Sequence, residues 1–177
     1  VLDLRRTGAL DDEAIEMAQR LKPFNLKWRE EPVWPPEDHR GLARVQTHGG
    51  IPTAAGENAM LPEFKSMFEA GAITYAQPSV TKVGGVTQMR KVMALADAFG
   101  VNVVPHSAYF GPGLIASIHC IAAMPNESLV ERYDADFAAN PLHDAINPGP
   151  DGRIAVPQGA GLGIDPDLAV IAKLRVS

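Results

Sequence analysis

Residues 26–32 read Leu-Lys-Trp-Arg-Glu-Glu-Pro, and this segment predicts a β-strand over Leu26–Glu30 that ends at a carboxylate. On both sides of it, short apolar runs alternate with amphipathic stretches. The other expected strands are Val1–Leu4, Ile51–Ala55, Ile73–Gln77, Val101–Val104 and Ser128–Glu131. The expected helices are Asp12–Leu21, Pro62–Ala70, Val86–Phe99 and Gly113–Met124. Strands separated by helices of this length predict parallel βα units and therefore an α/β fold.

A polar residue lies at or shortly after the end of the apolar run of each expected strand. These residues are Asp3, Glu30, Glu57, Ser79, His106 and Glu131, at successive spacings of 27, 27, 22, 27 and 25 residues. Each step is about the length of one βα unit. In a (β/α) barrel, residues at the strand carboxyl ends converge on one mouth, where the chemistry takes place. A doubly wound open sheet gives similar spacing, but it would splay three acids apart, so the acids favour the barrel.

Composition narrows the classes of function. The chain has 177 residues and a net charge of −5, so it offers no basic face for nucleic acid. No apolar run reaches the roughly 18 residues that a membrane span requires. The single cysteine, Cys120, excludes an internal disulfide and is typical of a reducing, cytoplasmic setting. Residues 140–163 are rich in Gly, Pro and Asn and predict mostly loop, with a short strand near Arg153–Val156.

Three of the strand-end residues are acids: Asp3, Glu30 and Glu57. A set of carboxylates with few other ligands suits a hard cation that prefers oxygen, Mg²⁺ or Mn²⁺, and leaves room for water and substrate. The alternative interpretation is that each acid caps a helix or pairs with a nearby arginine.

Five ordered motifs carry a resemblance to a known family. They are Trp28-Arg29-Glu30-Glu31-Pro32, Pro52–Asn58, Gln77–Thr87, Pro105-His106-Ser107 and Leu129–Asp134. Together they resemble the ligand and catalytic strands of the mandelate racemase and muconate lactonizing enzyme group of the enolase superfamily. The resemblance runs from about Asp12 to the end of the chain. Within that group it is most similar to the acid-sugar dehydratases.

The resemblance implies a TIM-type (β/α)₇β barrel. We expect only part of it here, because the family's N-terminal capping domain and first strands, one of which bears a catalytic lysine, have no counterpart. The chain is then a piece of a longer protein or a shortened form that self-associates. We expect a partial barrel over residues 1–139 and a loop-rich extension over residues 140–177 that packs on the barrel or capping region.

The resemblance also implies roles for the strand-end residues. Glu30 and Glu57 bind Mg²⁺, with Asp3 at the position of the first ligand, and the cation holds a substrate carboxylate. His106 exchanges the proton α to that carboxylate or protonates a departing hydroxyl. Glu131, in its protonated form, donates a hydrogen bond to the charge that develops.

Ser79, Lys82 and Ser107 are the expected substrate-binding residues. The family often has an aspartate paired with the histidine at the position of Ser79, and serine cannot supply that charge. Dehydration of a sugar acid is therefore favoured over a racemase, epimerase or cycloisomerase reaction, which stays the alternative. A non-catalytic, self-associating half-barrel is the alternative of another class. The expected partners are a small carboxylate-bearing substrate and further copies of the chain.

Overall fold

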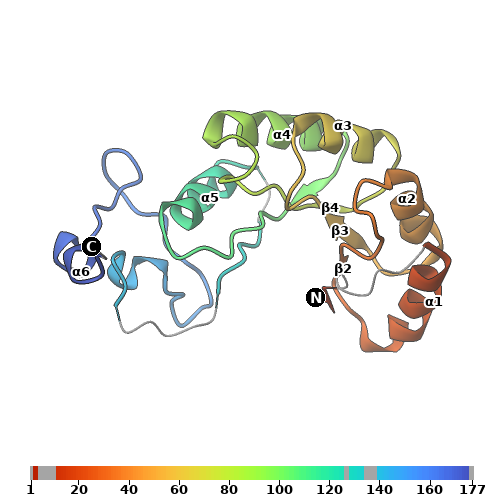
Figure 1. Ribbon diagram of the computed structural model, residues 1–177, viewed down its shortest axis with the longest axis horizontal. Coiled ribbons are helices and arrows are strands. Elements are labelled where there is room, and N and C mark those ends of the chain that lie inside the picture. Colours follow the sequence, from red (N-terminus) through yellow and green to blue (C-terminus); the bar gives the residue numbers. More distant parts are fainter. Residues whose placement is uncertain (1, 4–10, 126–127, 134–138, 176–177) are drawn as a thin grey trace. The chain divides into compact units, whose positions relative to one another are not determined.

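A computed structural model describes residues 2–3, 11–125, 128–133 and 139–175 (Figure 1). Its parallel strands form one sheet in the order β1-β2-β3-β4-β5. The strands are β1 (Leu2–Asp3), β2 (Arg29–Glu30), β3 (Thr53–Ala55), β4 (Tyr75–Ala76) and β5 (Asn102–Val103). A doubly wound sheet reverses its strand order at a switch point, whereas a barrel adds each strand beside the last. The sequential order is therefore that of a β/α barrel, as the sequence predicted.

One helix connects each pair of strands. These helices are α1 (Asp11–Leu21), α2 (His39–His48), α3 (Leu61–Glu69) and α4 (Val86–Ala98), with the 3₁₀ turn η1 (Lys22–Phe24) after α1. Each helix packs against the next, and Figure 1 shows the row on one side of the sheet. The carboxyl ends of the strands, where the connections to the helices begin, therefore form one edge.

Local signals fix where these helices begin. The Asp38 side chain accepts a hydrogen bond from Gly41 N at 2.9 Å and caps α2. Glu63 accepts one from Met60 N at 3.0 Å and caps α3. α4 follows Gly85, whose φ of 85° lies in the left-handed region that favours glycine.

Helix α2 was not among the helices expected from the sequence, so residues 39–48 would have been taken for loop. His39 and His48 are the first and last residues of α2. The apolar face of this helix consists of little more than Leu42 and Val45, so its periodicity is weak.

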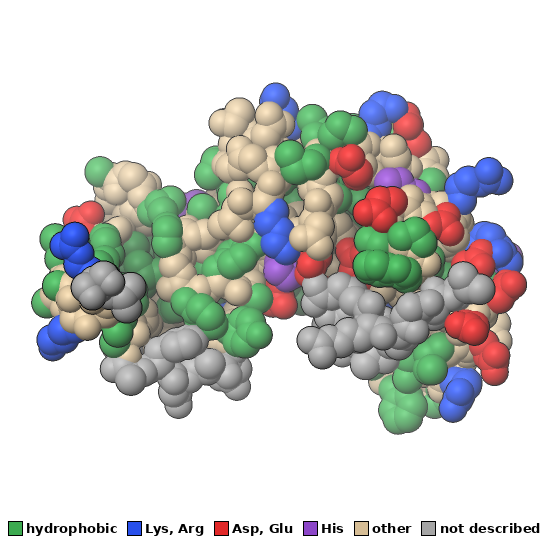
Figure 2. All heavy atoms as spheres, in the orientation of Figure 1, with side chains coloured by type: hydrophobic (Ala, Val, Ile, Leu, Met, Phe, Trp, Pro, Cys, Tyr) green, Lys and Arg blue, Asp and Glu red, His purple; other side chains and the backbone are tan. Residues whose placement is uncertain are grey.

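Arg44 joins α2 to α1 by ion pairs with Asp11 and Asp12. The hydrogen bond to Asp12 and the charges of both acids raise the pKa of Arg44. On the face drawn in Figure 2, acidic and basic side chains lie side by side over these two helices.

The sheet has an apolar side and a helix side. Trp28, Ala54, Tyr75 and Val104 pack together, and the rings of Trp28 and Tyr75 are 4.9 Å apart. The next residue, Arg29, faces α2 instead because side chains alternate along a strand. Its guanidinium is fully buried and donates to Val45 O and to Thr53 Oγ1. Burial lowers the pKa of Arg29 to about 10.

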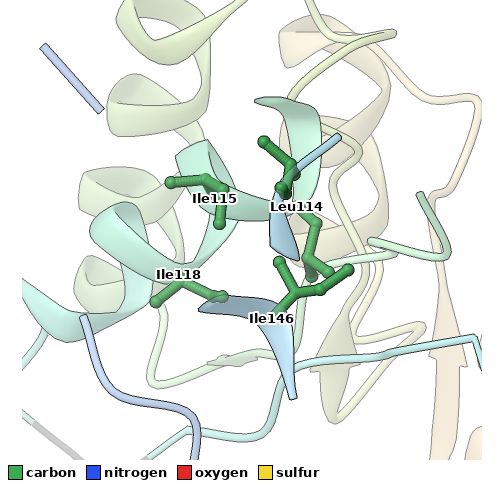
Figure 3. Close-up of a cluster of buried hydrophobic side chains, with 5 residues drawn as sticks. Leu114, Ile115, Ile118 and Ile146 are labelled. Atoms are coloured by element: carbon green, nitrogen blue, oxygen red, sulfur yellow. The ribbon is translucent and has the colours of Figure 1, made fainter. Parts of the chain in front are cut away.

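The chain divides into two compact units, Val1–Pro105 and His106–Ser177, called unit 1 and unit 2 below. Unit 2 contains α5 (Pro112–Ala122), the 3₁₀ turn η2 (His143–Ile146) and α6 (Leu168–Lys173). Its core joins residues of α5 to Leu142 and Ile146. Figure 3 shows Leu114, Ile115 and Ile118 of α5 with Ile146 in this cluster.

Two expected strands of unit 2 are wrong. Residues 128–131 form no strand, and neither do residues 153–156. Both segments are apolar because they pack on the core: Val130, Ile154 and Val156 contact the cluster around α5. The apolar pattern of the sequence indicates that these residues are buried, but it does not indicate whether a neighbouring strand is present to pair with them. The predicted division at residues 139 and 140 stays a prediction. Within the described part of the chain, no helix is long and apolar enough to cross a membrane.

Candidate functional site

Two buried carboxylates lie at the carboxyl ends of neighbouring strands. Glu30 is the last residue of β2 and pairs in register with Ala54 of β3, while Glu57 follows the end of β3 by two residues. Each residue is only 6% exposed. Asp3 pairs in register with Glu30 across β1 and β2, but its side chain lies outside the described side chains. The sequence therefore placed these acids at the correct edge of the sheet.

Glu30 is held by an amide that the sequence interpretation did not single out. Gln77 follows β4 directly, is 3% exposed, and donates from Nε2 to Glu30 Oε2 at 2.7 Å. This hydrogen bond to a charged acceptor is stronger than one between neutral groups. Its position in the sequence could have marked Gln77 as a residue of this site, because it lies at the end of an expected strand, directly before Pro78 and Ser79.

Asn58 and Lys82 lie beside Glu57. Asn58 Nδ2 donates to Glu57 Oε1 at 2.8 Å, and Lys82 Nζ lies 3.4 Å from the same oxygen. Lys82 also donates to Asn58 Oδ1 at 2.9 Å. The turn after β4 directs Lys82 to this position, because its backbone N–H bonds to Ser79 O at 3.0 Å. Lys82, expected as a substrate-binding residue, therefore contacts an expected metal ligand.

Glu31, the residue that follows β2, holds the backbone beside Glu57 in place through its hydrogen bonds. Glu31 has a φ of 45°, which non-glycine residues rarely adopt. Its N–H donates to Ala54 O at 3.0 Å, and its Oε1 accepts from Gly56 N at 2.8 Å. Two bonds to the neighbouring strand thus stabilise the unusual conformation of Glu31, and they set the position of the peptide that precedes Glu57.

Ser79 is fully buried, and its Oγ lies 3.3 Å from Thr81 Oγ1. Its backbone carbonyl accepts hydrogen bonds from the N–H groups of Lys82 and Val83. These contacts place Ser79 at the base of the turn that carries Lys82.

Unit 2 brings together three of the expected residues. His106 Nε2 lies 3.9 Å from Glu131 Oε2, and the His106 ring makes an edge contact with Tyr109. Ser107 is fully buried and makes two hydrogen bonds to Glu131. Its Oγ donates to Glu131 O at 2.7 Å, and its backbone N donates to Glu131 Oε2 at 3.3 Å. These bonds hold Glu131 in position. The side chain of Glu131 is 43% exposed. The segment that failed to form a strand is thus tied to the His106 segment through Ser107.

The donor atoms in unit 1 fit a hard divalent cation. Glu30 and Glu57 offer carboxylate oxygens, which are the ligands that hard cations prefer. Among the side chains that are described, no group of three or more His, Cys, Asp or Glu residues is close enough together to bind a metal ion. Two carboxylates with waters are a donor set typical of Mg²⁺.

A sequentially ordered parallel sheet with acids at its carboxyl edge defines a protein of the β/α-barrel class. The sequence profile of the enolase C-terminal domain-like family matches residues 4–170. Since that match spans most of the 177 residues, the chain belongs to this family. The resemblance seen in the sequence is confirmed.

Named relatives and solved structures agree with this assignment. The chain is 32% identical over 169 residues to the 3,6-anhydro-alpha-L-galactonate cycloisomerase of Streptomyces coelicolor, covering 93% of this chain and 44% of the relative. It is 31% identical over 166 residues to the D-galactonate dehydratase of Ralstonia pickettii, and the match covers 88% of this chain and 42% of the relative. The structure of a racemase from Streptomyces coelicolor with bound magnesium matches with a TM-score of 0.77 and 31% identity. The match covers 95% of this chain and 44% of the racemase chain. The chain thus spans less than half the length of these proteins.

Proposed function

We propose that this chain belongs to an enzyme that moves the proton α to the carboxylate of a sugar acid, with Mg²⁺ as cofactor, and that the reaction is a dehydration. The observation that carries the proposal is the pair Glu30 and Glu57, each 6% exposed at the carboxyl ends of adjacent parallel strands. Buried carboxylates need compensating charge or hydrogen bonds, and this edge is where β/α barrels place their chemistry. The names of two relatives, a D-galactonate dehydratase and a 3,6-anhydro-alpha-L-galactonate cycloisomerase, support the substrate class.

In this proposal Glu30 and Glu57 hold the cation, with Asp3 as the third candidate ligand. When bound, Mg²⁺ supplies positive charge against the negative charge that develops on the substrate carboxylate. Lys82 exchanges its contact with Glu57 for one with the substrate, and Ser79 shapes the turn that presents it.

His106 acts as the acid–base. Loss of a hydroxyl from a sugar acid needs a proton donor at the departing oxygen, and imidazole can both give and take a proton near neutral pH. Glu131, 3.9 Å from His106 Nε2, is the second proton-bearing group of the proposal, and Ser107 fixes the segment that carries it.

Two other functions have specific support. A cycloisomerase or racemase would use the same residues, and two of the matched proteins bear those names. A non-catalytic, self-associating half-barrel would agree with the short coverage of the relatives and with serine at position 79.

The first test is calorimetric titration of the chain with Mg²⁺. We expect weak binding that Glu30→Gln and Glu57→Gln each abolish. The matched control is Glu63→Gln, because Glu63 loses the same charge but only caps α3. Equal binding by all four proteins would contradict the metal site, and absence of binding in the parent chain would favour the non-catalytic alternative.

The second test separates the reactions. The chain is incubated in deuterated water with a panel of aldonic and aldaric acids. A keto-acid product supports dehydration. Uptake of deuterium into unchanged or inverted substrate supports a racemase or epimerase, and formation of an isomer supports a cycloisomerase.

A further inference from the structure

Gln77 has an unusual pair of environments for its two polar atoms. Nε2 donates to Glu30 Oε2 at 2.7 Å, whereas Oε1 is buried and has no hydrogen-bond partner among the described residues. Buried polar atoms without partners are rare because their desolvation is not repaid. The side-chain amide of Gln77 is therefore oriented so that Nε2 has a hydrogen-bond partner and Oε1 has none among the described residues.

The charge of Glu30 explains that orientation. If the amide turned over, its carbonyl oxygen would face the carboxylate, and two acceptors would repel each other. An N–H directed at a charged acceptor is worth more than one directed at a neutral group. The unpartnered Oε1 is thus the consequence of directing the N–H of Gln77 at Glu30.

A hydrogen bond to one carboxylate oxygen restricts the rotation of the whole group. With Oε2 held by Gln77, the carboxylate of Glu30 keeps a preferred orientation toward a cation. Bonds of this kind orient metal ligands, and their removal typically lowers metal affinity by about 10-fold to 100-fold.

We propose that Gln77 is a positioning residue that orients Glu30 for binding of a divalent cation. This inference rests on the proposed function, since it requires Glu30 to be a ligand. It adds a residue from β4 to a site whose expected ligands come from β1, β2 and the end of β3.

The chain offers a matched control in Gln46 on α2. Gln46 Nε2 donates to Thr74 Oγ1 at 2.8 Å, and its Oε1 accepts from Thr53 N at 2.8 Å. It is a second glutamine that links segments of unit 1, but its described contacts include no carboxylate. Both of its polar atoms are satisfied.

The experiment compares Gln77→Met and Gln46→Met by thermal unfolding without metal and by calorimetric titration with Mg²⁺. Methionine keeps the length of glutamine and removes both polar atoms. For Gln77→Met we expect a lower thermal midpoint, because the buried Glu30 loses the hydrogen bond to its charged oxygen, together with about 10-fold to 100-fold weaker Mg²⁺ binding. For Gln46→Met we expect a lower midpoint and unchanged Mg²⁺ affinity.

Gln77→Asn is the second variant. It keeps the amide but shortens it by one methylene, so the N–H no longer reaches Glu30, and Mg²⁺ binding should weaken although the residue stays polar. If Gln77→Met and Gln77→Asn both bind Mg²⁺ within 2-fold of the parent chain, a threshold below the range expected for such a bond, the inference is wrong. It is also wrong if Gln46→Met loses as much affinity as Gln77→Met, since the effect would then follow from lost packing.

Glu57→Gln distinguishes failure of this inference from failure of the proposed function. Binding by the parent chain that Glu57→Gln abolishes and Gln77→Met leaves intact would overturn only the role of Gln77. No binding by the parent chain would overturn the metal site and the role of Gln77 together.

Discussion

Lys82 lies beside a carboxylate oxygen of Glu57, one of the proposed metal ligands. Its Nζ is 3.4 Å from Glu57 Oε1, so it partly neutralises an expected ligand before any metal binds. Binding of Mg²⁺ to Glu57 must then break or weaken this ion pair. We therefore expect Lys82→Met to bind Mg²⁺ more tightly than the parent chain.

The size of the effect follows from the geometry. Coulomb's law gives about 1 kcal/mol for two charges at this distance in water and about 5 kcal/mol at an effective dielectric constant of about 20. The Lys82 side chain is 37% exposed, which favours the lower figure. Exposed ion pairs contribute about 0.2–1 kcal/mol after desolvation and lost side-chain freedom are included. The expected gain in Mg²⁺ affinity is therefore about 1.4-fold to 5-fold.

Calorimetric titration at low and at high KCl concentration measures this gain. Lys65→Met is the matched control, because Lys65 pairs with Glu69 on the exposed surface of α3 at 2.5 Å and its loss changes the net charge equally. We expect that control to leave Mg²⁺ affinity almost unchanged. The gain in Lys82→Met should shrink at high salt, because salt screens the exposed charge.

Weaker Mg²⁺ binding by Lys82→Met would refute this reasoning, since it would mean that Lys82 supports the metal site. An equal gain in Lys65→Met would assign the effect to net charge. The proposed contact with substrate predicts that Lys82→Met, although tighter for Mg²⁺, has lower affinity for a sugar acid. A gain for both ligands would contradict that role.

Three further predictions concern other parts of the chain. If the chain dehydrates a sugar acid, His106→Asn should lower kcat by about 10²-fold to 10⁴-fold with Mg²⁺ affinity unchanged, and an unchanged kcat would exclude His106 as the acid–base. For Arg29, a pKa lowered from its ordinary value to about 10 corresponds to about 3 kcal/mol of desolvation below pH 10. Val45 O keeps its bond from Gly49 N, so in urea unfolding Arg29→Met should be as stable as the parent chain or more so, whereas Arg29→Ala should lose about 2–5 kcal/mol through the cavity. Since the folded pKa is the lower one, any advantage of Arg29→Met should be constant from pH 5 to 9 and shrink above about pH 10. Finally, β1 and β5 each pair on one side only among the described strands, so light scattering should show a dimer or larger assembly, and a monodisperse monomer would contradict this.

The sequence was sufficient where a feature is local. The order of polar residues at strand ends predicted a barrel, and Glu30 and Glu57 lie at the carboxyl edge as expected. It also placed His106 and Glu131 at successive strand ends, and the structure brings His106 Nε2 to 3.9 Å from Glu131 Oε2 although residues 128–131 form no strand. These predictions need only the period of βα units and the identity of the residue that follows each strand.

Contacts between distant segments were not predictable in this way. Gln77 and Glu30 are 47 residues apart, and nothing in the local sequence around either indicates the bond. The direction of Lys82 toward Glu57 depends likewise on the turn after β4. Helix α2 escaped detection because a short apolar face carries little periodicity, and residues 128–131 were taken for a strand because burial against a core resembles burial in a sheet.

The two proposed ligands differ in what binding a cation would require of their neighbours. Gln77 is neutral and donates to Oε2 of Glu30, so this bond can persist when Glu30 binds a cation. Lys82 carries a charge of the same sign as the cation and lies 3.4 Å from Oε1 of Glu57, so a cation on Glu57 weakens this ion pair. If both carboxylates are ligands, Glu30 is the preformed half of the site and Glu57 the half that exchanges partners. Salt should therefore affect Mg²⁺ affinity through Glu57, and loss of Gln77 should affect it at every salt concentration.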